Sequence, residues 1–162
     1  TELRKLVAIG RVPVLVLDDG EALIESAAIL DYIDEIAGPS RALVPRAGLE
    51  RRKALRIIAS ATAAFDKAIA ISYERRRPAE NTSADWLGRC RVQLDAALSE
   101  LEAFRLELPR DNALRQTEIS AACAYAYVRR VEPDAVSGGR YPGLDRLSAA
   151  CEDREQFAAC PF

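Results

Sequence analysis

Residues 10–29, GRVPVLVLDDGEALIESAAI, carry the clearest structural pattern in the chain. An apolar, β-branched run at 12–17 is followed by the turn residues 18–20 and a second apolar run at 22–24, which is the pattern of a β-hairpin. Because the first run is apolar at consecutive positions, we expect this strand to be covered on both faces, which a lone hairpin does not achieve. Pro13 near the strand start fits an edge, a bulge or a cis peptide bond before it.

A helix is predicted directly after the hairpin. Ser26 is placed to cap its first turn, and the pattern ends at Gly38-Pro39. Apolar residues recur between these points at helical spacing, namely Ile29, Leu30, Ile33 and Ile36.

The composition changes after Gly38. Residues 39–45, PSRALVP, read as a linker, and no convincing strand follows them. We therefore predict a first domain at 1–38 and an all-helical domain at 46–162.

Four helices are predicted in the second domain from apolar periodicity and helix-breaking residues. The first spans about 48–76 and should turn inward Leu55, Ile58, Thr62, Phe65, Ile69 and Tyr73. The second starts at a Thr82-x-x-Asp85 cap, carries Trp86, Cys90, Leu94, Leu98, Leu101 and Phe104, and breaks at 108–112. The third is capped by Thr117, ends near Val131 and should turn inward Ile119, Cys123, Ala126 and Tyr127. A short helix at 142–152 precedes a final turn through Phe157.

Composition narrows the classes of function. The chain has 162 residues, of which 49% are apolar and 30% charged, so we expect a soluble globular protein of one or two small domains. A net charge of −2 gives no support for nucleic acid or an anionic membrane as partner. Histidine is absent, which removes His-based acid–base catalysis and the commonest metal ligand.

The cysteines and the N-terminus bear on compartment and completeness. Four cysteines without a C-x-x-C pair suit neither a zinc site nor a disulfide framework, and we interpret each as a reduced core thiol: Cys90, Cys123, Cys151 and Cys160. No apolar run of transmembrane or signal-peptide type is present, so we expect a cytoplasmic protein. Methionine is absent even at position 1, and we expect the functional polypeptide to be longer than this chain.

Residues 10–29, with their V-P…E-S-x-A-I combination, resemble the second half of the thioredoxin-like domain of glutathione S-transferases. The helical remainder is similar to the C-terminal domain of that family, including Tyr141-Pro142-Gly143-Leu144 and the closing Phe157-x-x-x-Pro161. The resemblance implies an α+β part, a partial thioredoxin-like domain of hairpin plus helix, followed by an all-α, glutathione-transferase-type bundle. It also implies a β-α-β unit before the first strand, which would hold the Ser, Tyr or Cys that contacts the glutathione sulfur. The catalytic residue is therefore unknown in this chain.

The resemblance also implies a glutathione site. Val12 matches the residue whose backbone pairs with the cysteinyl unit of glutathione, and Pro13 matches the cis-proline after it. Glu25 and Ser26 match the pair that holds the γ-glutamyl end, and Arg11 is in reach of the glycyl carboxylate. The residues alone leave plainer alternatives: an edge-strand proline, a solvated strand end, an ordinary helix cap and a surface arginine.

The second substrate should lie against the long helices, with Phe65, Tyr73 and Trp86 as candidate wall residues; aromatic residues at helical spacing are otherwise core. The predicted function is to bind glutathione and to conjugate or reduce an electrophilic small molecule. The alternative is a non-catalytic glutathione-transferase-like module for binding or assembly. We expect glutathione as co-substrate, no metal, a homodimer, and neither nucleic acid nor membrane as partner.

Overall fold

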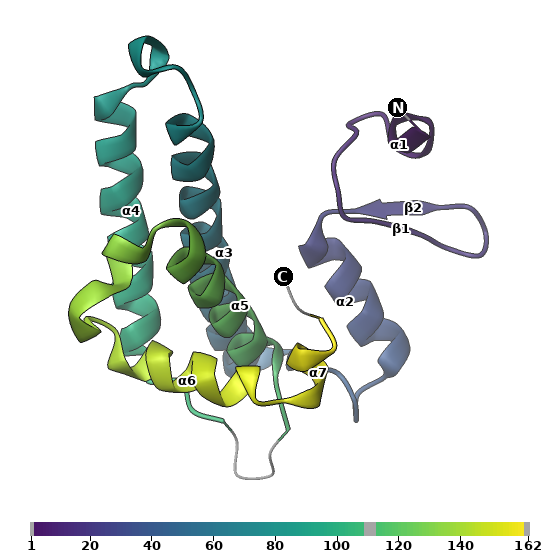
Figure 1. The fold of residues 1–162 in the computed structure, drawn as a ribbon. Helices are drawn as coiled ribbons and strands as arrows, with labels where there is room; N and C mark the ends of the chain where they lie inside the picture. Colours follow the sequence, from purple (N-terminus) through teal and green to yellow (C-terminus); the bar gives the residue numbers. More distant parts are fainter. Residues whose placement is uncertain (1, 109–112, 161–162) are drawn as a thin grey trace. The chain divides into compact units, whose positions relative to one another are not determined.

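The computed structural model describes residues 2–108 and 113–160, and the chain packs as two compact units. Unit 1 covers residues 1–46 and unit 2 covers residues 47–162 (Figure 1).

Unit 1 contains a short helix, a hairpin and a longer helix. These are α1 (Glu2–Leu6), β1 (Val14–Val16), β2 (Ala22–Ile24) and α2 (Ser26–Ala37). The strands are antiparallel, with Leu15 opposite Leu23, so the predicted hairpin is confirmed with a shorter first strand. Gly20, at a φ of 89°, closes the turn and donates its N–H to the carbonyl of Leu17 at 3.0 Å. The sequence analysis did not anticipate α1.

The described part of unit 1 does not cover the first strand on both faces, so this expectation stays a prediction. The sheet has two strands, and none of residues 2–46 is buried. Val16 remains 47% exposed, and on α2 the apolar residues Leu30, Ile33 and Ile36 are 38%, 44% and 65% exposed. A two-stranded sheet with one helix offers too little apolar surface to bury these side chains.

Unit 2 is helical, as predicted. Its elements are α3 (Gly48–Arg75), η1 (Ala79–Asn81), α4 (Ala84–Ala103), α5 (Gln116–Val131), η2 (Pro133–Gly139), α6 (Pro142–Glu152) and α7 (Glu155–Ala158). The long α3 packs against both α4 and α5, and α5 also packs against α6 (Figure 1).

The predicted inward stripe of α3 is wrong. Leu55, Phe65 and Tyr73 are exposed, and Thr62 with them. The buried face carries mostly small residues, namely Ala54, Ser60, Ala61, Ala64, Ala68, Ile71 and Glu74. Small side chains let α4 and α5 approach α3 closely, and this packing outweighs the larger apolar residues that the periodicity favoured.

The predicted core face of α4 is confirmed except at Trp86, which is 42% exposed, and Phe104, which is half-buried, whereas that of α5 is wrong. In α4 the fully buried residues include Cys90, Leu94, Leu98 and Leu101. In α5 the predicted inward set is partly or largely exposed, and the buried residues are Gln116, Thr117, Glu118, Ala121, Ala122, Ala124, Tyr125 and Val128. Tyr125 is completely buried and donates its hydroxyl to Asp145 on α6 at 2.8 Å, which fixes the rotation of α5.

Two predicted helix caps of unit 2 are corrected. The cap of α4 is Ser83, whose hydroxyl accepts the N–H of Trp86 at 3.2 Å. The predicted Thr82 instead donates its hydroxyl to the Pro78 carbonyl at 3.1 Å. In α5, Thr117 lies inside the first turn, one residue after the helix begins.

Two further expectations concern chain segments near the gaps. The predicted break at 108–112 falls largely on residues 109–112, which lie outside the described residues, and α4 already ends at Ala103. Pro161 of the closing motif also lies outside them.

Candidate functional site

The candidate residues of unit 1 meet at one end of the hairpin. The register pairs Val14 with Ile24, so Pro13 and Glu25 follow one position beyond the last pair. The peptide bond between Val12 and Pro13 is cis. This is one of the three explanations that the sequence left open for Pro13, beside an edge strand and a bulge. The same hairpin end therefore carries the proline and the start of α2.

Val12 is the most exposed of the large apolar residues, at 76%. It lies outside the two paired strands, and within residues 2–108 and 113–160 its backbone makes no hydrogen bond to another backbone group. Backbone N–H and C=O groups that have no partner in the hairpin are suited to pairing with a peptide ligand.

Glu25 joins β2 to α2 in an unusual backbone conformation. Its φ of 68° and ψ of 132° lie in a region that residues with a side chain rarely adopt. Its carbonyl accepts the first bond of α2, from the Ile29 N–H at 3.1 Å, so Glu25 is the N-cap residue. Strain of this kind costs about 1 to 3 kcal/mol and is concentrated at functional sites.

The expectation that Ser26 caps α2 is wrong. The helix begins at Ser26 itself, and no side chain caps it. Ser26 is exposed, and its hydroxyl makes no hydrogen bond within the part of the chain that the structure describes. The backbone N–H groups at the start of a helix have no acceptor inside it, so this end of α2 presents free donors and the positive end of the helix dipole.

Arg11 and Glu25 form an ion pair across this end of the hairpin. The Arg11 Nη1 lies 3.0 Å from the Glu25 Oε1, and the two side chains are 65% and 50% exposed. An exposed pair of this type contributes about 0 to 1 kcal/mol, so a ligand that carries both charges can replace it at small cost.

The three proposed wall residues have different neighbours in unit 2. Phe65 contacts Tyr127, with ring centroids 4.5 Å apart. Tyr73 is 64% exposed beneath Arg76, and Trp86 is 42% exposed beneath Lys67. Their exposure contradicts the alternative that these aromatic residues belong to the core. Their role in substrate binding stays a prediction.

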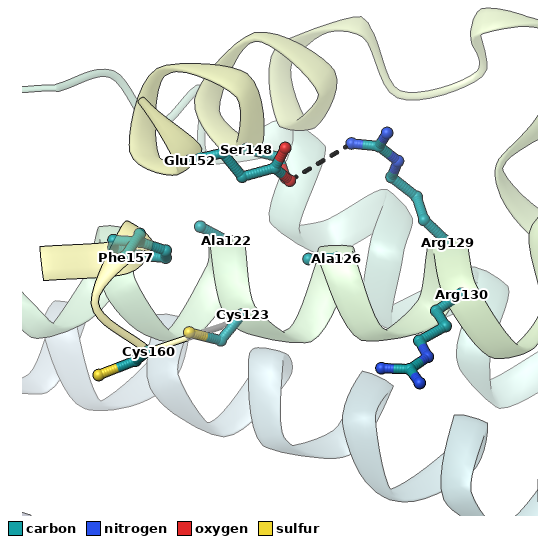
Figure 2. Close-up of a pocket in the computed structure, with 9 residues that line it drawn as sticks. All are labelled: Ala122, Cys123, Ala126, Arg129, Arg130, Ser148, Glu152, Phe157 and Cys160. Atoms are coloured by element: carbon teal, nitrogen blue, oxygen red, sulfur yellow. Dashed lines mark hydrogen bonds and ion pairs between the residues drawn. The ribbon is translucent and has the colours of Figure 1, made fainter. Parts of the chain in front are cut away.

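Unit 2 also contains a cavity that the sequence analysis missed. It is open to solvent, has a volume of about 450 Å³ and is lined by residues of α5, α6, α7 and the turn after α7 (Figure 2). Cys123 and Cys160 both line it and both reach solvent, so their interpretation as core thiols is wrong. Cys90 and Cys151 are buried, as predicted.

Two further properties concern the described residues alone. Among residues 2–108 and 113–160, no cluster of three or more His, Cys, Asp or Glu side chains is placed to hold a metal ion. No described helix combines the length and the apolar character needed to cross a membrane.

The architecture and the hairpin end define a thioredoxin-like half-domain joined to a transferase-type helical domain. Residues 1–41 match the family described as the glutathione S-transferase N-terminal domain. The uncharacterized GST-like protein YibF of Escherichia coli (strain K12) is 34% identical over 153 residues, which are 93% of this chain and 74% of that protein. The chain belongs to the glutathione S-transferase family.

Solved structures agree with this assignment. A glutathione transferase family member from Pseudomonas fluorescens Pf-5, with bound glutathione, is 28% identical with a TM-score of 0.85 over 98% of this chain and 77% of its own. A glutathione S-transferase from Methylobacterium radiotolerans, in complex with glutathione sulfonate, is 27% identical with a TM-score of 0.85 over 98% of this chain and 76% of its own.

Proposed function

We propose that this chain binds glutathione at the hairpin end of unit 1. We propose that it acts as part of a cytoplasmic glutathione S-transferase, which conjugates glutathione to an electrophile or reduces the electrophile. The observation that carries the proposal is the conjunction of the cis Val12–Pro13 bond with the strained Glu25 and the uncapped Ser26. The similar structures that contain glutathione or its sulfonate support the choice of ligand.

Each part of glutathione has a partner of suitable chemistry. The backbone of Val12 would pair with the cysteinyl unit in the manner of an added strand. The α-carboxylate of the γ-glutamyl end would accept from the Ser26 hydroxyl and from the N–H groups at the start of α2. The Glu25 carboxylate would bind the ammonium, and Arg11, released from Glu25, would bind the glycyl carboxylate.

Stabilising the glutathione thiolate is what makes a transferase a catalyst, because the thiolate is the nucleophile that attacks an electrophile. Residues 2–25 contain no serine, tyrosine or cysteine to donate a hydrogen bond to it. The second candidate function is a glutathione-transferase-like module for binding or assembly without turnover.

Calorimetric titration with glutathione tests the binding site. Glu25→Ala and Ser26→Ala should each weaken binding about tenfold or more, since each removes a partner of a ligand charge. Glu35→Ala and Ser40→Ala, exposed positions of unit 1 away from the hairpin end, should bind like the parent chain. Equal affinity in all four variants would remove Glu25 and Ser26 from the site.

An activity assay separates the two candidate functions. Conjugation of glutathione to a chloronitrobenzene, or reduction of an organic hydroperoxide, should exceed the uncatalysed rate if the chain supplies catalysis. Glutathione binding without acceleration of either reaction would establish the binding module instead.

We also propose a homodimer, with α3 in the interface. Leu49 and Leu55 on α3 are 55% and 43% exposed, and exposed apolar side chains of this kind are typical of the buried part of subunit interfaces. Light scattering at micromolar concentration should give twice the chain mass of 17.8 kDa. A mass of one chain would contradict this proposal.

A further inference from the structure

The cavity of unit 2 brings two cysteines from distant parts of the sequence to one place. Cys123 lies in the middle of α5, and Cys160 lies in the turn that follows α7. Both thiols line the same cavity and both reach solvent. Figure 2 shows the two side chains at the same end of the cavity, below Phe157.

The electrostatics of Cys123 agree with this placement. Partial burial raises the pKa of the Cys123 thiol, and the neighbouring Cys160 thiol raises that pKa further. Cys123 raises the pKa of the buried Cys151 in the same way, so Cys123 lies near both of these cysteines, and only Cys160 shares its access to solvent.

The segment that carries Cys160 is held to the core by few described contacts. Helix α7 is a single turn of four residues, and only Phe157 of it is described as packing against the core. The Cys160 N–H donates to the Phe157 carbonyl at 3.0 Å, so the turn keeps its thiol next to that anchor. A disulfide requires its two Cβ atoms to come within about 4 Å, so the turn after α7 has to bring Cys160 this close to Cys123.

The cavity is also suited to a small anionic reagent. Arg130 follows Cys123 by two helical turns on the same face of α5, and among the described residues it makes no ion pair. Arg129 lies 3.5 Å from Glu152, and both side chains are about half exposed. A guanidinium without an ion pair at the other end of the same pocket attracts a reagent that carries carboxylates, and a volume of about 450 Å³ is typical of small-molecule pockets.

We propose that Cys123 and Cys160 are a redox-active dithiol that forms an intrachain disulfide, with glutathione disulfide as the oxidant. The Cys160 thiolate attacks one sulfur of glutathione disulfide, which forms a mixed disulfide and releases one glutathione thiolate. The Cys123 thiolate then attacks the Cys160 sulfur and releases the second glutathione. Two electrons pass from the two cysteines to the oxidant, and the two thiol protons end on the two glutathione molecules.

This dithiol is independent of the glutathione site proposed in unit 1. The other two cysteines provide internal controls, since Cys90 and Cys151 are 0% exposed. Burial raises the pKa of Cys151 to about 11, which keeps it as an unreactive thiol at neutral pH.

The test is intact-mass analysis of the full chain after reduction, incubation with glutathione disulfide, and alkylation under denaturing conditions. The four alkylatable thiols should fall to two, and peptide mapping should identify a Cys123–Cys160 bridge. Cys123→Ser and Cys160→Ser should each stop at one stable glutathionyl adduct on the remaining thiol. Glu25→Ala should form the bridge like the parent chain, which separates this proposal from the function of unit 1.

Three results would overturn the proposal. The first is four alkylated thiols after exposure to the oxidant, and the second is a glutathionyl group on both cysteines without a bridge. The third is a disulfide between chains in place of one within the chain. Circular dichroism of each variant shows that it is folded, so that a negative result is assigned to the chemistry.

Discussion

The two units of this chain differ in where their apolar residues lie. None of residues 2–46 is buried, whereas unit 2 buries a continuous core of alanines, leucines and two tyrosines. Unit 1 in turn carries the strained Glu25, the uncapped Ser26 and the exposed Val12. The comparison indicates that unit 2 supplies the stability of the described chain, while the groups proposed for ligand binding lie in unit 1.

Core truncation should show the largest difference between the units. Leu98→Ala in α4, at a position with 0% exposure, should lower the free energy of unfolding by about 2 to 5 kcal/mol. Val16→Ala in β1, at 47% exposure, should lower it by less than about 1 kcal/mol. Urea denaturation followed by circular dichroism measures both values. Equal losses would contradict the assignment of stability to unit 2.

Removal of the Glu102 carboxylate in unit 2 should have the next largest effect on stability. Glu102 accepts the N–H of Gly143 at 2.7 Å and that of Leu144 at 2.9 Å, which satisfies the start of α6. Glu102→Ala should cost about 2 kcal/mol, and the exposed Glu107→Ala should cost less than about 0.5 kcal/mol.

The contact between Glu102 and the start of α6 also predicts that substitutions at Glu102 and Gly143 are not additive. A Cβ at Gly143 would lie 2.9 Å from a Glu102 carboxylate oxygen, so Gly143→Ala should destabilise the parent chain. In a Glu102→Ala background the clash is absent, and the better helix propensity of alanine should make the same substitution neutral or stabilising. Additive losses in the double variant would show that the carboxylate does not hold α6.

In unit 1 the local backbone structure could be predicted from the sequence better than the packing of the side chains. The hairpin and the cis proline follow from local signals, namely the turn residues 18–20 and a proline at a strand start. The backbone of Glu25 and the correct cap of α2 could not be predicted, because a hydroxyl residue before an apolar repeat is the ordinary signature of a cap.

Unit 2 shows the opposite limitation. Its helices follow from periodicity, but their rotation depends on packing between helices. Alanines such as Ala64 and Ala68 form the buried face of α3, because their size permits close approach, while Phe65 beside them is exposed. The rotation of α5 likewise leaves Cys123 at a cavity that no local pattern indicated.

Two serines at helix starts, one in each unit, should differ in their effect on stability by a smaller amount. Ser83 caps α4 through the Trp86 N–H, so Ser83→Ala should cost about 1 kcal/mol. Ser26 caps nothing, so Ser26→Ala should change the free energy of unfolding by less than about 0.5 kcal/mol while it weakens glutathione binding. A loss of stability in Ser26→Ala similar to that of Ser83→Ala would assign it a structural role.

The smallest effect concerns the pH dependence of unit 2. The hydrogen bond from the Ser83 N–H lowers the pKa of Glu74, and the Ser60 hydroxyl followed by Arg56 lowers that of Glu100. A lowered pKa in the folded state stabilises the chain above the unfolded value of 4.5, and this stabilisation is lost as the pH falls through the folded pKa.

Urea midpoints should therefore decrease between about pH 6 and about pH 3, less steeply in Glu74→Gln and in Glu100→Gln than in the parent chain. Glu107→Gln, at an exposed position, is the matched control and should keep the slope of the parent chain. Identical slopes in all variants would show that neither carboxylate is linked to folding.

The most direct test of the central claim is a titration of the ¹⁵N-labelled full chain with S-methylglutathione, followed by amide chemical shifts. The methylated sulfur cannot exchange with cysteine, so binding is observed apart from redox chemistry. The account predicts the largest shifts at the amides of Val12, Ser26 and Ala27, with small shifts across the core of unit 2. Shifts confined to unit 2, or no saturable shift at the hairpin end, would contradict it.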